Sequence, residues 1–280
     1  MSSSSTATSH SKKGRIIMVY LVSLVLICFG FRMNFYVGLV VLLLALGLIA
    51  YKSLPSIYAT LGNKAYHAGD NDGVKKYYNK ALATDRAPVS SYSTYVLMLM
   101  RMGELDKALE IANLAIINRK FAERDKYVLK EYRALIYYHK GETEEALEDA
   151  REIFDNYKNT TIYSLLGFLM LACDEPIDET LAFCLEAYDY NSDDRDVVDN
   201  LLLAYYKNGD LDKASELADE LLEMSPTFIE AQYHSALIAK AKGDIEKAKE
   251  YIENLDDCIR TALTTVSEEE IEEFSKSLEN

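Results

Sequence analysis

Hydrophobic residues follow two different patterns along the chain, and the change comes near residue 52. Residues 16–31 form an apolar run of 16 residues without a charge, and residues 35–51 form a second run of 17. Only Arg32, Met33 and Asn34 separate the two runs. From residue 53 onward, apolar stretches alternate with short polar turns at a regular spacing. The pattern predicts two apolar helices followed by a series of amphipathic ones, and hence an all-α protein.

The two apolar runs are each about as long as a membrane requires. A 17-residue helix is about 25 Å long, slightly less than the roughly 30 Å of a hydrocarbon core, so flanking side chains must reach the interface. We interpret residues 16–51 as a two-helix transmembrane hairpin, with spans 16–31 and 35–51, after a polar and basic tail, residues 1–15. A cleaved signal peptide also has a basic start and an apolar stretch, but no small-x-small cleavage site follows, and Ile27 before Cys28 disfavours a lipoprotein.

Basic residues near the runs predict the orientation. They precede the first run and follow the second, whereas the turn carries one base, and the residues concerned are Lys12, Lys13 and Arg15, then Arg32, then Lys52 and Lys64. Because such residues favour the cytoplasmic side, we expect a multi-pass protein of the cell membrane with both termini in the cytoplasm. If one run does not insert, the remainder of the chain lies on the other side.

The rest of the chain repeats a unit of about 34 residues. A turn residue recurs at spacings of 34, 38, 34, 34 and 34, namely at Gly69, Gly103, Gly141, Glu175, Gly209 and Gly243. Five residues after each of these comes a small side chain: Val74, Ala108, Ala146, Thr180, Ala214 and Ala248. A fixed period of this length predicts stacked repeats, with the small residues where two helices approach closely.

Segments such as LMRMGELDKALEIANLAI and IAKAKGDIEKAKEYIENL carry the unit most clearly. They resemble the tetratricopeptide-repeat family over residues 53–262, about six repeats. The resemblance implies a right-handed α-solenoid of helix-turn-helix units whose concave groove binds proteins. Repeat four departs from the pattern, with Asp174-Glu175-Pro176 at its turn and Phe168 at an expected small position. Four extra residues around 119–126 are expected to lengthen the turn before repeat three.

The last 18 residues, 263–280, predict an acidic capping helix. Ser267 and Glu270 have capping-box spacing, and Ile271, Phe274 and Leu278 follow at helical intervals. Such a helix covers the open end of a solenoid with a polar outer face.

Charge and composition restrict the function. Five of the 30 basic residues lie in residues 1–52, which leaves 25 bases against all 45 acids in the remainder, a formal charge of −20. Such a surface repels phosphates, so nucleic acid is not an expected partner. The four cysteines have no CxxC spacing, and we expect buried free thiols in a reducing compartment. We expect no metal, no cofactor and no catalytic activity, because no nucleophile elbow, phosphate loop or HExxH motif is present.

The resemblance also implies a set of binding residues at the end of each repeat's first helix, which faces the groove in the family. The predicted groove residues are Asn63, Tyr66, His67, Met100, Arg101, Tyr138, His139, Tyr206 and Lys207, with Lys240 one near-equivalent step further. Rings and bases there suit an extended peptide with carboxylates. The same residues can instead pack the helices together or complement helix dipoles. Asn63 resembles the first asparagine of the carboxylate-clamp subgroup, but Ala59 and Leu97 replace other clamp positions, so that specificity is not carried over.

From these observations we expect a membrane-anchored scaffold or adaptor that holds a protein segment in its groove. The alternative is a structural homo-oligomer without an external ligand.

Overall fold

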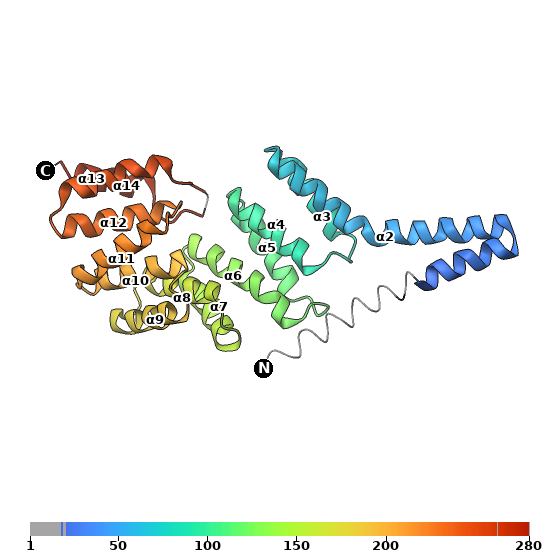
Figure 1. Cartoon of the computed structure of the whole chain (residues 1–280), viewed down its shortest axis with the longest axis horizontal. Coiled ribbons are helices and arrows are strands. Elements are labelled where there is room, and N and C mark those ends of the chain that lie inside the picture. The colour runs from blue at the N-terminus through green and yellow to red at the C-terminus, as the bar shows by residue number, and fades with distance from the viewer. Residues whose placement is uncertain (1–17, 19–20, 262, 280) are drawn as a thin grey trace. The chain divides into compact units, whose positions relative to one another are not determined.

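The computed structural model describes residues 18, 21–261 and 263–279 (Figure 1). The chain divides into two compact units, Met1–Pro88 and Val89–Asn280. Within the described ranges the chain is helical, and its β-structure consists of one isolated bridge between Phe228 and Ile259. The predicted tail, residues 1–15, lies outside the described residues. The all-α prediction is confirmed.

The first unit begins with a helical hairpin that turns at Asn34. The helix Leu21–Met33 ends there and α2 (Phe35–His67) begins, with the Asn34 side chain accepting a hydrogen bond from the Tyr36 N–H at 2.8 Å. Gly30 and Gly38 let the two backbones meet, since a Cβ atom on Gly30 would stand 3.1 Å from the Cα of Gly38. Absence of a side chain at both positions therefore permits the close turn.

α2 continues through the predicted end of the membrane hairpin without a break. It runs 33 residues, so the second apolar run and the first helix of repeat one form a single helix, with Pro55 inside it. By length and composition α2 can cross a membrane, with a mean hydropathy of 2.2 over its most apolar window, only 6 % of which is buried. Leu21–Met33 is a shorter apolar helix, and part of the first run lies outside the described residues. Among the described helices one, not two, has the length of a full span.

The first repeat is completed by α3 (Asn71–Leu82), which packs on the end of α2. Gly62 faces the Tyr78 ring, where a Cβ atom would come within 2.6 Å of ring carbons. The buried Tyr78 hydroxyl donates a 2.5 Å hydrogen bond to Asn63 Oδ1. A small residue at Gly62 is therefore required for this pair of helices to close.

The second unit contains five further helix pairs and a final helix (Figure 1). Its helices are α4 (Val89–Arg101), α5 (Leu105–Ile116), α6 (Glu123–His139), α7 (Thr143–Asn156), α8 (Thr160–Ala172), α9 (Ile177–Tyr190), α10 (Arg195–Lys207), α11 (Leu211–Glu223), α12 (Ile229–Ala241), α13 (Ile245–Glu253), the 3₁₀ turn η1 (Asn254–Asp257) and α14 (Glu268–Lys276). The first helices of successive pairs, α4, α6, α8, α10 and α12, pack against one another. Stacked pairs of this kind make a solenoid.

The six predicted small positions are all fully buried. Val74, Ala108, Ala146, Thr180, Ala214 and Ala248 each have an exposed fraction of 0 %. The five turn glycines adopt positive φ angles between 71° and 85°. These glycines end their helices in the left-handed conformation that other residues adopt only at a cost.

Repeat four turns one residue earlier than predicted. Asp174, not Glu175, has the positive φ angle of 52°, and the N–H of Glu175 bonds to the carbonyl of Met170. The N–H of Asp70, which follows Gly69, bonds in the same way to Ala65. Asp174 is therefore the counterpart of the glycines, because aspartate tolerates the left-handed conformation better than most residues.

The four extra residues before repeat three lengthen a helix, contrary to the prediction that they lengthen a turn. α6 has 17 residues, whereas α4, α8, α10 and α12 each have 13. The connection before α6 spans residues 117–122. Glu123 and Asp125 in the first turn of α6 favour this extension, because acids stabilise a helix N-terminus.

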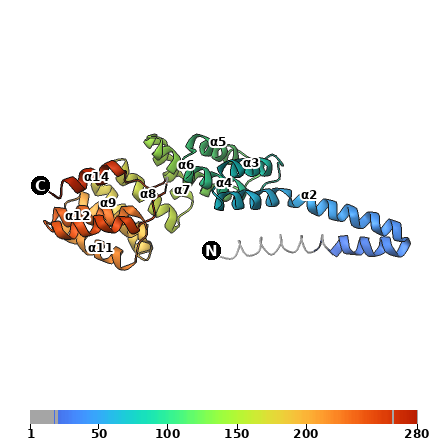
Figure 2. The same ribbon diagram turned by 90° about the horizontal axis from the view of Figure 1, so that it is seen from above.

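The final helix caps the second unit as predicted. Ser267 and Glu270 form both hydrogen bonds of the capping box. Phe274 and Leu278 are buried, and the Phe274 ring meets the Tyr233 ring edge-on at 5.5 Å. α14 thus lies beside α12 and α13 and covers apolar surface that an unpaired last repeat would expose (Figures 1 and 2).

Candidate functional site

Three of the predicted groove residues belong to the first unit. The Asn63 side chain is engaged by Tyr78, as described above. Tyr66 is half-buried and His67 is exposed, and their rings lie 6.0 Å apart. Tyr66 and His67 therefore remain available at the end of α2.

The predicted groove residues of the second unit differ in how accessible they are. Met100 is fully buried in the core, so it offers no surface to a ligand. Arg101 is exposed, and Tyr206 is half-buried. Tyr138 packs edge-on against Phe168 with 4.9 Å between ring centroids.

His139 is half-buried, and its Nε2 atom has no hydrogen-bond partner among the described residues. Burial lowers the pKa of this imidazole. A neutral ring supplies no charge to a ligand, so His139 does not contribute a base to the groove.

Two of the predicted basic residues stabilise the fold. The Lys207 ammonium donates to the Leu171 carbonyl at 2.8 Å and to Asp174 at 3.0 Å, at the end of α8. Lys240 donates to Ser277 and lies 5.1 Å from the centre of the Phe274 ring. Cations at a helix C-terminus complement its dipole. Of the predicted lysines and arginines, Arg101 therefore remains free among the described residues.

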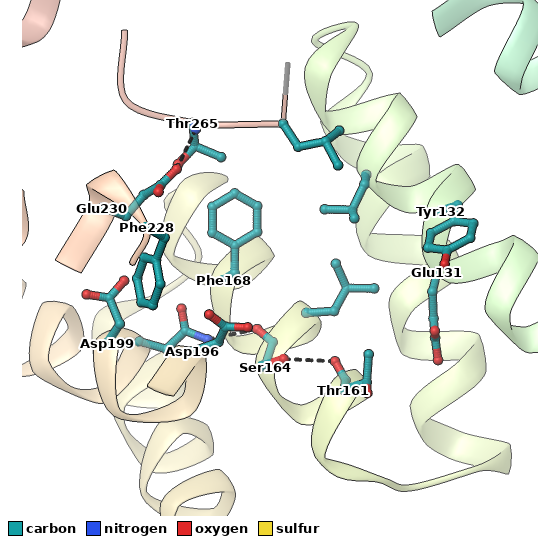
Figure 3. A pocket seen from close by; sticks show the side chains of 14 residues that line it. Glu131, Tyr132, Thr161, Ser164, Phe168, Asp196, Asp199, Phe228, Glu230 and Thr265 are labelled. Carbon is teal, nitrogen blue, oxygen red and sulfur yellow. Dashed lines mark hydrogen bonds between the residues drawn. The ribbon is translucent and has the colours of Figure 1, made fainter. Parts of the chain in front are cut away.

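A pocket of about 350 Å³ opens on the face formed by the first helices of repeats three to six (Figure 3). α6, α8 and α10 supply most of its walls, and the start of α12 and the segment before α14 close it. Its lining residues are Glu131, Tyr132, Leu135, Thr161, Ser164, Leu165, Phe168, Asp196, Asp199, Asn200, Phe228, Glu230, Leu263 and Thr265. A concave pocket of this size, with apolar walls and converging polar groups, is a usual form of a ligand site.

Side chains of both kinds converge on this pocket. Phe168 and Phe228 extend into it from the same side, and Leu135, Leu165 and Leu263 add apolar surface. The Asn200 side chain donates to the Ser164 carbonyl at 2.8 Å and joins α10 to α8 across the pocket floor. The walls are thus held by inter-repeat contacts.

Acids, not bases, supply the charge of the pocket. Four carboxylates line it, Glu131, Asp196, Asp199 and Glu230, and among the described lining residues there is no Lys, Arg or His. The sequence pattern did not identify them, because they lie two to three turns before the helix ends where the groove residues were expected. When the repeats are aligned on their turn residues, Glu131 is equivalent to Asp199 and Asp196 to Glu230, and this comparison would have found them.

Two of these carboxylates have partners. The buried Asp199 accepts from Nδ1 of the half-buried His234 at 2.9 Å. Burial opposes a charge on this ring, but the Asp199 carboxylate outweighs it and raises the pKa of His234. Glu230 accepts from the backbone N–H and the hydroxyl of Thr265, at 2.6 and 2.9 Å. The segment Leu263–Thr265 is held over the pocket by these two bonds.

The other two carboxylates are unpaired within the described part of the chain. Glu131 has an exposed fraction of 9 %, and burial raises its pKa. Asp196 is exposed at the rim, where surrounding protein atoms still desolvate it. This desolvation, together with repulsion from Asp194, Asp199 and Glu230, raises the pKa of Asp196 to about 6.

The described residues include no group of three or more His, Cys, Asp or Glu side chains placed to hold a metal ion. All four cysteines are free. Cys184 is fully buried, and burial raises the pKa of its thiol to about 12, so it is unreactive at neutral pH. Contrary to the expectation of buried thiols, Cys28 is exposed and Cys173 and Cys258 are half-buried.

Comparison with known proteins agrees with the fold. Residues 229–256, which make up most of repeat six, match the profile of the tetratricopeptide repeat. No curated protein matches the chain by sequence.

Several solved structures are similar to this chain. A tetratricopeptide-repeat protein of Thermus thermophilus, TTC0263, is 14 % identical, with a TM-score of 0.56 over 69 % of this chain and 100 % of its own. Pseudomonas aeruginosa PilF is 17 % identical, with a TM-score of 0.59 over 81 % of this chain and 99 % of its own. A chain of the APC/C hetero-tetramer Cut9-Hcn1 is 13 % identical, with a TM-score of 0.62 over 81 % of this chain and 43 % of its own.

At these identities the likeness shows the fold. Together with the matched repeat, the buried small positions and the left-handed turns at the expected places, it shows that the chain has the tetratricopeptide-repeat fold.

Proposed function

We propose that this protein is a membrane-anchored scaffold that binds a segment of another protein on the concave face of its second unit. The tetratricopeptide-repeat fold is an interaction scaffold, and its stacked first helices create an extended surface for a partner. The pocket of about 350 Å³ between α6, α8, α10 and α12 is the observation that carries the proposal. It combines apolar walls with converging polar groups, as sites for protein segments do.

The apolar surface of the first unit supports the membrane anchor. Many large apolar side chains between residues 21 and 51 are exposed. Leu24, Phe29, Leu43 and Leu48, for example, have exposed fractions of 57–60 %. Exposed apolar helices of this length are unfavourable in water and favourable in a bilayer. We propose that the first apolar run crosses the membrane outward and that α2 crosses it back, so that both termini lie in the cytoplasm.

Position-specific photo-crosslinking tests the binding proposal. A benzophenone amino acid replaces Tyr132 or Phe228 in the pocket, and Leu185, an exposed residue of α9, serves as the control position. After irradiation of cells, we expect protein adducts at the two pocket positions and none at Leu185. Adducts at all three positions, or at Leu185 alone, would contradict the proposal. An adduct with a second copy of this chain would instead favour the homo-oligomer.

Cysteine labelling in intact cells tests the topology. Asp189 is exposed on α9 and forms no hydrogen bond or ion pair with the described residues that a substitution would break. In an Asp189→Cys variant without the native cysteines, we expect a membrane-impermeant maleimide to react only after lysis. Labelling of intact cells would place the second unit outside and show that one apolar run does not cross.

A further inference from the structure

We infer that the segment bound in this pocket carries a lysine or arginine side chain next to a bulky apolar one. This inference rests on the proposed function and names the chemistry of its partner. It reverses the expectation from the sequence, in which groove bases were to pair with carboxylates of a peptide.

The charge of the pocket is the first reason. Four carboxylates line it, and no basic side chain does so among the residues that the structure describes there. Basic side chains also lie in the wider surroundings of the pocket. Arg101 is close enough to influence Tyr132 electrostatically, Arg195 influences Asp196, and Lys207 influences His234. Lys207 is already bound to Asp174, so these groups leave the pocket itself negative.

Glu131 is the second and independent reason. Only 9 % of this residue is exposed, and it lines the pocket. No hydrogen bond or ion pair joins it to any described residue. A buried charge without a partner is costly, and an ammonium or guanidinium group from a ligand would supply the missing partner. The hydroxyl oxygens of Thr161 and Ser164, which also line the pocket, can accept further hydrogen bonds from such a group.

Asp196 extends the negative surface to the rim. It has no ion pair among the described residues, and Asp194 lies close enough to repel it. Asp199 and Glu230 are bound by His234 and Thr265 and stand further along the same wall. A cation that enters past Asp196 therefore meets carboxylates from α10, α12 and α6.

The apolar walls define the rest of the ligand. Phe168, Phe228, Leu135, Leu165 and Leu263 require contact with apolar groups if binding is to bury them. The basic residues 12–15 of this chain are followed directly by the apolar run 16–31, but the proposed function places that run in the membrane, where it is not free to fill the pocket. A partner protein with a basic and apolar segment is the occupant that fits both features.

Selection from a random peptide library tests the inference on the full-length protein in detergent or nanodiscs. We expect enriched peptides to carry Lys or Arg beside Leu, Ile, Phe or Met and to be depleted of Asp and Glu. Replacing the basic residue of a selected peptide with glutamine should weaken its binding about tenfold or more, measured by fluorescence anisotropy.

Variants of the protein show whether the pocket is responsible. Glu131→Gln and Asp196→Asn should each weaken the selected peptide several-fold, whereas Glu148→Gln, the same change at an exposed position of α7, should not. Thermal melting by circular dichroism verifies that each variant folds. Removal of residues 2–15 should leave the affinity unchanged.

The outcomes separate the two proposals. Enrichment of acidic or uncharged peptides that crosslink in the pocket would overturn the cationic ligand and leave the proposed function intact. No enrichment of any peptide would overturn the proposed function itself. Basic peptides that bind Glu131→Gln and Asp196→Asn as tightly as the natural protein would reveal general attraction to an acidic surface, and this too would overturn the inference. A large gain in affinity on removing residues 2–15 would identify the chain's own tail as the occupant.

Discussion

Arg133 holds Asp149 through two parallel hydrogen bonds of 2.6 Å, from Nε to Oδ2 and from Nη2 to Oδ1. Asp149 is almost fully buried, and the remaining guanidinium nitrogen donates to Asn113 Oδ1 at 2.9 Å. The three residues belong to α6, α7 and α5, so one guanidinium ties repeat three to repeat two. A bidentate pair of this kind is the strongest form of charged hydrogen bond in proteins.

Removal of the Asp149 carboxylate should therefore destabilise the second unit. We expect Asp149→Ala to lower the free energy of unfolding by about 3 kcal/mol, because it leaves a half-buried guanidinium without its partner. Asp155→Ala, at an exposed position of the same helix, should change it by less than about 0.5 kcal/mol. Thermal melting followed by circular dichroism compares the two variants. Equal losses would show that the Arg133 pair contributes nothing.

The pair of His234 and Asp199 should make stability depend on pH. The folded protein raises the pKa of His234 above its usual 6.5, so the charged ring is stabilised in the native state. This contribution is fully present below pH 6.5 and is lost as the pH rises through the higher value of the folded state. We expect the melting temperature to fall across this window in the natural protein.

A glutamine at position 234 provides the comparison. His234→Gln should flatten the dependence between pH 6 and pH 8, whereas His67→Gln, at an exposed position in the first unit, should not alter it. A dependence that persists unchanged in His234→Gln would contradict the assignment to this pair.

The buried small positions should not accept larger side chains. Ala146 and Ala214 are fully buried where two helices meet, so a leucine there must displace its neighbours. We expect Ala146→Leu or Ala214→Leu to destabilise the protein by about 1–3 kcal/mol. Ala241→Leu, exposed near the end of α12, serves as the matched control and should be close to neutral. A neutral result at Ala146 would show that the helices separate at little cost.

Binding of a basic peptide should weaken in acid. The pKa of Asp196 is raised to about 6 by desolvation and by Asp194, Asp199 and Glu230, with Arg195 opposing the shift. Between pH 7.5 and pH 5.5 this carboxylate gains a proton and loses its attraction for a cation. A peptide with arginine keeps its own charge over this range, so a lower affinity by anisotropy reports on the protein.

Asp196→Asn should bind more weakly at pH 7.5 and depend less on pH. His234 also gains charge as the pH falls, in the same direction, so His234→Gln is measured in parallel. A pH profile that is identical in the natural protein and in Asp196→Asn would rule out Asp196 as its source.

The repeat period predicted most of the architecture. A small residue five places after each turn marks a helix contact, and all six such positions are buried. The prediction of these helix contacts succeeds because each repeat contacts mainly its neighbours, so a local sequence pattern determines the local packing. The same pattern misplaced the turn of repeat four, because aspartate at position 174 can take the role of glycine.

The candidate site was only partly predictable. The family register pointed to the first helix of each pair, which also supplies most of the pocket, but Lys207 and Lys240 bind groups of neighbouring elements that are 33 or more residues away in the chain. The pocket acids come from three helices and were part of what the sequence presented as an acidic exterior. A side chain's partner depends on the positions of several helices together, which no single repeat contains.

The sequence by itself determined the helical repeats, their turns, the capping helix and an apolar start, because these features depend on local spacing and on the preference of short segments for one conformation. Tertiary structure decided that α2 joins the apolar run to the first repeat, that the extra residues of repeat three extend α6, and that four carboxylates line one pocket. These outcomes depend on contacts between residues that are distant in the chain, and such contacts form only when the repeats stack.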